Sequence, residues 1–371
     1  MKILCVHQGY ELYGSDKTFI QSVKSFRQQY PDAFIHVLLP KKGAITEFIA
    51  PYASQIDYKF LWILRKSTLK SLLGKGAINL LSDTYAAWKL MREYDFTYIN
   101  TAVVLNFIIA SFFSSAKRVV HIHEIPTGLG SFIFSGLLVW SRAPIIYNSN
   151  ATLRSFFIPP WQFEKVIPNG VVNPLANIAP DTFTDETFNI LMIGRLNDWK
   201  GQDVLLKALN GMDDLKLKSI KLKIVGDVFE DQYHFKDELL QLIAKFNLSN
   251  SVELIGFKNN PESFYQWADV VVVPSKKPEP FGLVAIEAMS YGKCVIAANH
   301  GGLVDIVEQG VTGVLFRPLD IDALRAAICS VFNHRERCSS MGKNGYSRFT
   351  RLFTEDKYMQ AISILPSEVG Q

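Results

Sequence analysis

Cysteine is scarce in this chain of 371 residues, and its spacing excludes two common uses of the residue. The four cysteines, Cys5, Cys294, Cys329 and Cys338, form neither a C-x-x-C pair nor a cluster with histidine. A disulfide framework and a structural zinc site are therefore not expected. A reducing cytoplasm suits this cysteine usage best.

Long apolar runs are absent as well. The longest, Val103–Phe113 and Phe132–Trp140, reach about half of the roughly 20 residues that a membrane-spanning helix needs. The N-terminal Met-Lys-Ile-Leu-Cys-Val-His lacks the charged start, apolar stretch and cleavage site of a signal peptide. We therefore expect a cytoplasmic chain that does not cross a membrane.

Acidic residues are few in the first half of the chain. Up to residue 175 there are 18 Lys and Arg against 10 Asp and Glu, and the remainder has 21 against 25. The two halves therefore carry net charges of +8 and −4. This asymmetry predicts an anionic surface or ligand for the front half, although a solvated basic face has the same composition. No nucleic-acid recognition motif accompanies the charge, so DNA or RNA is not expected as a partner.

One basic segment, Tyr58–Lys75, mixes aromatic and aliphatic residues with five cations. Such a segment can lie on an anionic membrane surface, here through Lys59–Lys75, at the inner face of the cell membrane. A helix that packs its apolar face on the first domain would have the same residue pattern, and both interpretations stay open.

Short apolar runs alternate with helical patterns along the whole chain, which is typical of βαβ units around a parallel sheet. The pattern restarts at Phe188, after a linker-like stretch at Ile167–Thr184 that is rich in Pro, Asn, Asp and Thr. The expected domains are residues 1–172, residues 173–350 and a C-terminal helix within 351–371 that packs on either domain. Strands are expected at Lys2–His7, Phe34–Leu39, Thr97–Ile99, Arg118–His123, Ile145–Asn148, Phe188–Ile193, Lys221–Val225, Val252–Ile255, Val270–Val273 and Cys294–Ala297.

The segment from Pro274 to Met289 carries the clearest chemistry. Proline and glycine place Glu279 in a loop, and the helix-forming run that follows places Glu287 in an early helical turn. The amides of Gly282, Leu283 and Val284 at the helix start form an anion site. Carboxylates beside such amides suit a sugar diphosphate, whereas a glycosidase pair is the alternative use of two carboxylates.

A second motif, Gly194-Arg195 followed by Lys200-Gly201, joins a strand to a helix. Arg195 and Lys200 stand at the carboxyl end of the strand, where they can neutralise a diphosphate without a metal ion. Open parallel sheets bind ligands at this edge, so two facing sheets predict one site in the cleft between them.

Together these motifs resemble the signature of the family four retaining glycosyltransferases. The resemblance rests on Gly194-Arg195, Lys200-Gly201, the Glu279 to Glu287 run, Gly301-Gly302 and Gly310-Val-Thr-Gly313, over residues 190–319. It implies the GT-B fold, in which two Rossmann-like domains face each other across a central cleft. Asp305 departs from the family, which more often has Glu there, and the N-terminal half matches more loosely.

The resemblance also implies roles for single residues. Arg195 and Lys200 match the cations that hold the donor diphosphate, Glu287 the acid that binds the ribose, and Glu279 the acid that faces the donor sugar. The backbone of Phe281–Val284, with Gly194, lies near the sugar and phosphate.

In the front half, Gly14 resembles part of the family's first glycine-rich loop, which has two glycines in many members. His121-Ile-His123-Glu124 ends a strand, and His123 matches the family's histidine that faces the donor sugar. Because no third ligand is evident beside His121 and His123, a metal site is not expected.

The sequence therefore predicts a metal-independent retaining glycosyltransferase with no cofactor, whose donor is a nucleotide-diphosphate sugar. A saccharide or lipid-linked acceptor in bacterial surface polysaccharide, lipopolysaccharide or lipid-linked oligosaccharide synthesis is expected. A nucleotide-sugar epimerase or hydrolase of the same fold, or a non-catalytic sugar-nucleotide binding protein, remains the alternative.

Overall fold

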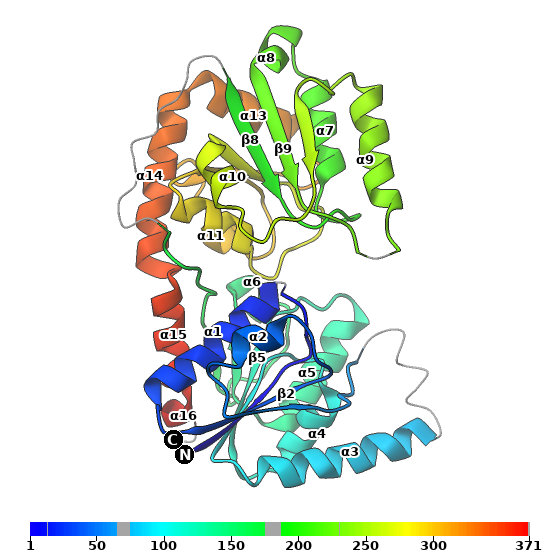
Figure 1. The fold of residues 1–371 in the computed structure, drawn as a ribbon, viewed down its shortest axis with the longest axis vertical. Coiled ribbons are helices and arrows are strands. Elements are labelled where there is room, and N and C mark those ends of the chain that lie inside the picture. The colour runs from blue at the N-terminus through cyan, green and yellow to red at the C-terminus, as the bar shows by residue number, and fades with distance from the viewer. Residues whose placement is uncertain (13, 65–74, 175–186, 230, 370–371) are drawn as a thin grey trace. The chain divides into compact units, whose positions relative to one another are not determined.

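The computed structural model describes residues 1–12, 14–64, 75–174, 187–229 and 231–369. The chain divides into two compact units (Figure 1). The first comprises Met1–Gly170 and Glu355–Gln371, and the second comprises Val171–Thr354. The sequence predicts boundaries at 172 and 350, and the chain passes between the units at residues 170 and 354.

The first unit contains a parallel sheet in the order β3-β2-β1-β4-β5-β6-β7. Its strands are β1 Lys2–Val6, β2 Phe34–Leu39, β3 Gln55–Tyr58, β4 Phe96–Ile99, β5 Lys117–Ile122, β6 Ile145–Tyr147 and β7 Glu164–Val166. Its helices are α1 Gly14–Gln29, α2 Ile45–Ile49, α3 Lys75–Met91, α4 Leu105–Phe113, α5 Leu129–Ser141, α6 Asn150–Leu153, α15 Glu355–Ser363 and α16 Leu365–Glu368.

Both faces of this sheet are buried, as the β-rich apolar runs require. Alternate residues of β1 point to opposite faces, so Ile3 packs with α1 and α15 while Leu4 packs with α3, α4 and α5. The C-terminal helix α15 therefore packs on the first unit, where the Tyr358 hydroxyl lies 2.7 Å from Ser22 Oγ on α1.

The second unit contains a parallel sheet in the order β10-β9-β8-β11-β12-β13. Its strands are β8 Phe188–Ile193, β9 Ile220–Val225, β10 Val252–Ile255, β11 Val270–Val273, β12 Cys294–Ala298 and β13 Gly313–Phe316. Its helices are α7 Gln202–Asn210, α8 Asp214–Ser219, α9 His234–Lys245, α10 Glu262–Trp267, α11 Leu283–Ser290, α12 Leu303–Ile306, α13 Ile321–Asn333 and α14 Arg335–Leu352.

The expected α/β class with two parallel sheets is confirmed. Each predicted strand is present within one residue at either end, whereas β3, β7 and β13 were not predicted. In both sheets the strand order reverses beside the first strand, between β1 and β4 and between β8 and β11. Such reversal points leave room at the carboxyl edge, which is where open α/β sheets bind ligands.

Candidate functional site

The carboxyl ends of β8 and β11 bring Lys200 and Glu279 together in the second unit. The two strands are hydrogen-bonded neighbours, so the loops that follow them meet at the same edge of the sheet. Lys200 Nζ donates to Glu279 Oε1 at 2.8 Å, across 79 positions of sequence. The sequence predicted both residues for this site, and the structure places them in direct contact.

Glu279 is an ionised carboxylate in a nearly closed environment, with 6% of its surface exposed. Burial alone would raise its pKa, but Lys200 and the Ser275 hydroxyl, which also donates to Oε1, lower the pKa below its ordinary value. His300 Nε2 donates to the Ser275 carbonyl at 2.8 Å. Burial lowers the pKa of His300, so its imidazole is neutral near pH 7. Lys200 is therefore the cation that balances Glu279.

Two glycines allow the site loops to approach backbone to backbone. Gly201 has φ +86°, and a Cβ atom there would lie 2.0 Å from the Pro274 carbonyl oxygen. Gly301 has φ +61°, and a Cβ atom there would lie 2.4 Å from the Glu279 carbonyl oxygen. Other residues would be strained at these φ values as well as too large. Both glycines thus hold the Lys200 and Glu279 loops in place.

Helix α11 begins beside this carboxylate. Gly282 precedes the helix at φ +121°, and the first-turn amides of Leu283 and Val284 follow it. Amides of a first turn have no acceptor within their own helix and favour an anion. Phe281, just before the helix, is buried in the core of the unit.

Glu287, one turn into α11, is oriented by a buried tyrosine. Tyr265 on α10 donates its hydroxyl to Glu287 Oε2 at 2.6 Å. Burial and the adjacent Glu287 carboxylate raise the pKa of Tyr265, so this hydroxyl keeps its proton. The second carboxylate oxygen, Oε1, accepts no hydrogen bond from the described residues.

Arg195 follows β8, and its guanidinium carbon lies 3.2 Å from the centroid of the Phe229 ring. Its backbone carbonyl accepts a hydrogen bond from Gln202 Nε2 at 2.9 Å. Gly194 completes the strand edge, where its amide donates to the Val225 carbonyl. All the residues predicted for the second unit therefore lie in the loops after β8 and β11 or in α11.

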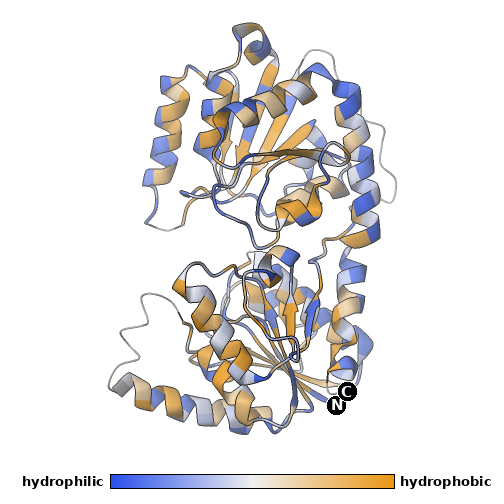
Figure 2. Ribbon diagram, turned by 180° about the vertical axis from the view of Figure 1, so that it is seen from behind, coloured by the Kyte–Doolittle hydropathy of each residue, from blue (hydrophilic) through white to orange (hydrophobic). Residues whose placement is uncertain are grey.

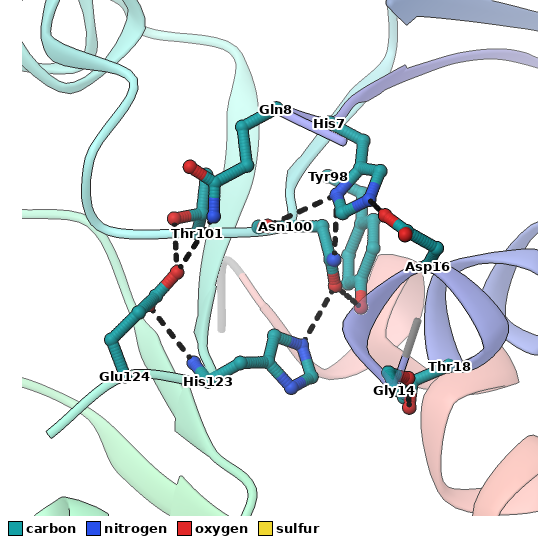
Figure 3. Close-up of polar contacts among 10 residues, drawn as sticks. All are labelled: His7, Gln8, Gly14, Asp16, Thr18, Tyr98, Asn100, Thr101, His123 and Glu124. Atoms are coloured by element: carbon teal, nitrogen blue, oxygen red, sulfur yellow. Dashed lines mark hydrogen bonds and ion pairs between the residues drawn. The ribbon is translucent and has the colours of Figure 1, made fainter. Parts of the chain in front are cut away.

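A second polar cluster lies at the carboxyl edge of the first sheet. Figure 3 shows Asn100, which directly follows β4, between the rings of His7 and His123. His7 follows β1, and its Nε2 contacts Asp16 Oδ1 on α1 at 2.8 Å. His123 follows β5, with Nε2 at 2.9 Å from Asn100 Oδ1. The cluster thus spans three adjacent strands at the reversal point of the sheet.

The hydrogen bonds of Asn100 indicate which ring nitrogen of each histidine carries the proton. Its Nδ2 donates to His7 Nδ1 at 3.0 Å, so His7 carries its proton on Nε2 and donates to Asp16. Asn100 Oδ1 accepts from His123 Nε2 and from the Tyr98 hydroxyl. His123 Nδ1 is therefore an unprotonated acceptor, and this buried atom has no partner among the described residues.

The stability of the first unit is expected to fall in mild acid because His123 is buried as a neutral ring. Burial, followed by the adjacent His7, lowers the pKa of His123 to about 3. Below pH ~6.5 the unfolded chain binds a proton that the folded chain does not, so acidification favours unfolding. At pH 5 this group alone should cost about 2 kcal/mol of unfolding free energy.

Urea unfolding of wild type and His123→Asn between pH 7 and pH 5 tests this prediction. The quantity compared is the slope of unfolding free energy against pH in the two proteins. Burial raises the pKa of Glu124, which acts in the opposite direction but is common to both proteins. The variant should therefore lose less stability than wild type on acidification. Equal slopes would contradict a neutral buried His123.

The other residues of the first unit that the sequence singles out are Gly14, His121 and Glu124. Gly14 is the first residue of α1 rather than a loop residue, and its carbonyl accepts from Thr18 Oγ1 at 2.9 Å; Tyr13 lies outside the described residues. His121 is fully buried, with Nδ1 at 2.6 Å from the Tyr98 hydroxyl. Glu124 accepts hydrogen bonds from Thr101 and Gln8 rather than contacting the histidine rings.

Much of the basic segment, residues 65–74, also lies outside the described residues. Its described start is extended chain, in which Leu61 and Trp62 are buried and Ile63 forms a bridge with Val104. In the described ranges no helix is long and apolar enough to cross a membrane. Nor do those ranges contain three or more His, Cys, Asp or Glu residues grouped so as to hold a metal ion.

Sequence reasoning did not identify Ser275, His300 and Tyr265 in the second unit, or His7, Asp16, Tyr98 and Asn100 in the first, as site residues. A usable signal existed for Asn100 and His7, since each is the first polar residue after a buried strand. The partners of Glu279 and Glu287 carry no such signal, because serine and tyrosine are common at many positions.

Comparison with known proteins is consistent with this geometry. Residues 177–348 match the family model of glycosyl transferases group 1. A lipopolysaccharide 1,2-N-acetylglucosaminetransferase of Salmonella typhimurium is 30% identical over 237 residues, 60% of each chain. A D-inositol 3-phosphate glycosyltransferase of Geodermatophilus obscurus is 33% identical over 192 residues, 49% of this chain and 41% of the relative. The chain thus spans between two fifths and three fifths of these curated relatives.

Similarity to solved structures covers the whole chain. Anabaena HepE in complex with UDP has a TM-score of 0.83 and 26% identity, with 100% of both chains covered. Its complex with UDP-glucose gives 0.80 and 25% over the same coverage. A Rickettsia africae glycosyltransferase is similar in fold alone, with a TM-score of 0.80 at 18% identity over 99% of this chain and 98% of that one. The chain therefore has the GT-B fold, and its residues 177–348 match the glycosyl transferases group 1 family.

Proposed function

We propose that this protein is a retaining glycosyltransferase that moves a sugar from a uridine diphosphate sugar to an acceptor hydroxyl. The observation that carries the proposal is the Lys200–Glu279 pair beside the start of α11. One cation, one ionised acid and a set of helix amides are what a sugar diphosphate needs for its phosphates and its hydroxyls. The similarity to HepE, which was crystallised with UDP and with UDP-glucose, supports uridine as the donor base.

In the proposed reaction the bond between the anomeric carbon and the diphosphate oxygen breaks, and a bond from the acceptor oxygen to the same face of that carbon forms. Negative charge develops on the departing diphosphate. Arg195, Lys200 and the α11 amides would stabilise this charge more in the transition state than in the ground state. The acceptor proton passes to the departing phosphate, so the step requires neither a protein nucleophile nor a metal ion.

His123 is proposed to face the donor sugar. Its unprotonated Nδ1 is a buried acceptor without a partner among the described residues. A sugar hydroxyl could donate a hydrogen bond to this atom. The neutral state of the ring suits this task, because a protonated imidazole could not accept a hydrogen bond.

The direct test is release of UDP from a panel of UDP-sugars with and without saccharide or lipid-linked acceptors. Release that depends on an acceptor, with a product of the donor's anomeric configuration by NMR, is the expected result. Equal release without acceptor would instead indicate a hydrolase, and conversion of the donor to an epimeric UDP-sugar without release would indicate an epimerase. A donor that raises the melting temperature but is never consumed would indicate a binding protein.

Glu287 gives a separate prediction for nucleotide binding. Its Oε1 is expected to accept from a ribose hydroxyl while Tyr265 holds Oε2. Replacing Glu287 with alanine should weaken UDP binding about 10–100-fold, since hydrogen bonds to a charged group contribute about 1.5–3 kcal/mol. Calorimetric titration measures the loss, and Glu253→Ala, an exposed acid on β10, is the matched control. Unchanged affinity in Glu287→Ala would remove this residue from the nucleotide site.

The proposed acceptor belongs to bacterial surface polysaccharide or lipopolysaccharide synthesis in the cytoplasm. Two observations support it: the net charge of +8 before residue 176 and the name of the Salmonella relative. A lipid carrier phosphate or an anionic saccharide would suit that charge.

A further inference from the structure

Helix α5 of the first unit presents a solvent-facing side with no polar group. Its exposed positions are Leu129, Phe132, Ile133, Gly136 and Trp140, spaced three or four residues apart as on one helix face. Leu129 is 74% exposed and Phe132 is 63% exposed. An outward helix face is normally polar, so an apolar one indicates a surface that is covered by something else.

Further aromatic side chains extend this face on both sides. Trp140 stacks on Phe112 at the end of α4, with ring centroids 4.7 Å apart, and Phe132 stacks on Phe157 at 4.9 Å. The segment after α6 is tied to α5 by a hydrogen bond from the Phe157 amide to Ser135 Oγ. We call the exposed apolar residues of this region the α5 surface. Its members are Phe112, Phe113, Leu129, Phe132, Ile133, Trp140, Phe157, Trp161 and Phe163.

The neighbouring α3 continues the apolar exposure. Helices α3, α4 and α5 pack side by side in chain order, and Ile78, Leu81 and Tyr85 on α3 are exposed. In Figure 2 the helices that follow α3 carry orange and near-white residues, and α5 contains no charged residue at all. No comparable cluster of exposed aromatic residues lies on one helix of the second unit in the residues described.

Between Phe96 and Glu164 every exposed charged residue is a cation. The two acids of this stretch are half-buried: Glu124 accepts from Thr101 and Gln8, and Glu164 accepts from the Tyr147 hydroxyl. The exposed cations are Lys117, Arg142 and Arg154. Arg142 directly follows α5, and its guanidinium lies over the Phe112 ring.

We propose that the α5 surface docks this protein on an anionic lipid bilayer. Tryptophan, phenylalanine and leucine side chains enter the boundary between headgroups and acyl chains, while flanking arginines meet anionic headgroups. A second copy of the chain fits less well, because a two-fold contact would bring the same unbalanced cations together. The surface differs from the Lys59–Lys75 segment that the sequence singles out, and the inference does not depend on the transfer reaction.

Vesicle binding by the 371-residue chain tests the proposal. Wild type should co-sediment with phosphatidylcholine vesicles that contain phosphatidylglycerol, and bind pure phosphatidylcholine vesicles far more weakly. Leu129→Ser/Phe132→Ser should weaken binding at least about tenfold, because two large apolar side chains no longer leave water. Leu215→Ser, which alters a 79% exposed leucine on α8 of the second unit, should bind like wild type.

The arginines provide an independent readout. Arg142→Gln/Arg154→Gln should weaken binding to the anionic vesicles about fivefold per removed cation and reduce its salt dependence. Melting curves check that each variant is folded, and if the double serine variant is not, Leu129→Ser alone provides the same test.

Three results would overturn the proposal. These are no binding of wild type to anionic vesicles, equal binding by the α5 variants, or a dimer in light scattering that the serine variants dissociate. The last result would assign the surface to a second copy of the chain.

Discussion

Replacing Lys200 with alanine is expected to lower the rate of glycosyl transfer about 10²–10³-fold, the usual effect of removing one charge-stabilising group from a transition state. The variant loses the cation that is proposed to stabilise the negative charge of the departing diphosphate. It also leaves Glu279 buried without its counter-charge, and breaking a buried pair in this way costs about 3–5 kcal/mol of stability. Acceptor-dependent UDP release measures the first effect, and thermal unfolding measures the second.

Two further variants separate the two effects. Lys200→Ala/Glu279→Gln removes both charges and should regain much of the lost stability while remaining inactive. Lys207→Ala removes one of the two lysines that pair with the half-exposed Asp203 on α7, and Lys276 remains. This control should leave both activity and melting temperature nearly unchanged. Transfer at the wild-type rate in Lys200→Ala would remove this lysine from the reaction.

The Lys200–Glu279 contact shows which part of the site was predictable from sequence. Each residue follows a strongly apolar strand, and the resemblance to known glycosyltransferases assigns both to the donor site. Their contact depends on β8 and β11 being neighbours, which the alternation of strands and helices makes the natural arrangement. Ser275 and His300 could not be predicted, because they reach Glu279 through loop conformations rather than through a periodic pattern.

The first unit shows where sequence reasoning is weaker. His7 and Asn100 meet because β1 pairs with β4, although β2, β3 and the helices α1, α2 and α3 lie between them in the chain. Neither composition nor periodicity reveals that pairing, and a polar residue after a strand is as common in turns as in sites. The strands missed, β3, β7 and β13, are the two edges of the first sheet and one edge of the second. Edge strands are short and half-exposed, so their apolar signal is faint.

Helices α4 and α5 were evident in the sequence only as apolar runs too short to span a membrane. The structure distinguishes the two helices, since α4 buries Phe107 and Ile108 in the core whereas α5 exposes Phe132 and Trp140 to solvent. A sequence pattern cannot distinguish these cases when both helices lack charged residues, because a polar face is the usual marker of the solvent side.

Replacing Asn100 with leucine is expected to lower the unfolding free energy of the first unit by about 3–5 kcal/mol. Leucine has a similar size, but it leaves His7 Nδ1 without the Asn100 donor and His123 Nε2 without its acceptor. The melting temperature of the unit should fall by about 10 °C. Asn106→Leu is the matched control, since among the described residues this buried asparagine makes one long hydrogen bond, with the Trp62 amide at 3.4 Å.

Urea unfolding of Asn100→Leu and Asn106→Leu at pH 7 measures the difference between the two variants. Asn100→Leu should lose more unfolding free energy, because Asn100 joins three elements of the first unit through His7, Tyr98 and His123. If Asn100→Leu costs no more than Asn106→Leu, the hydrogen bonds of Asn100 do not stabilise the first unit.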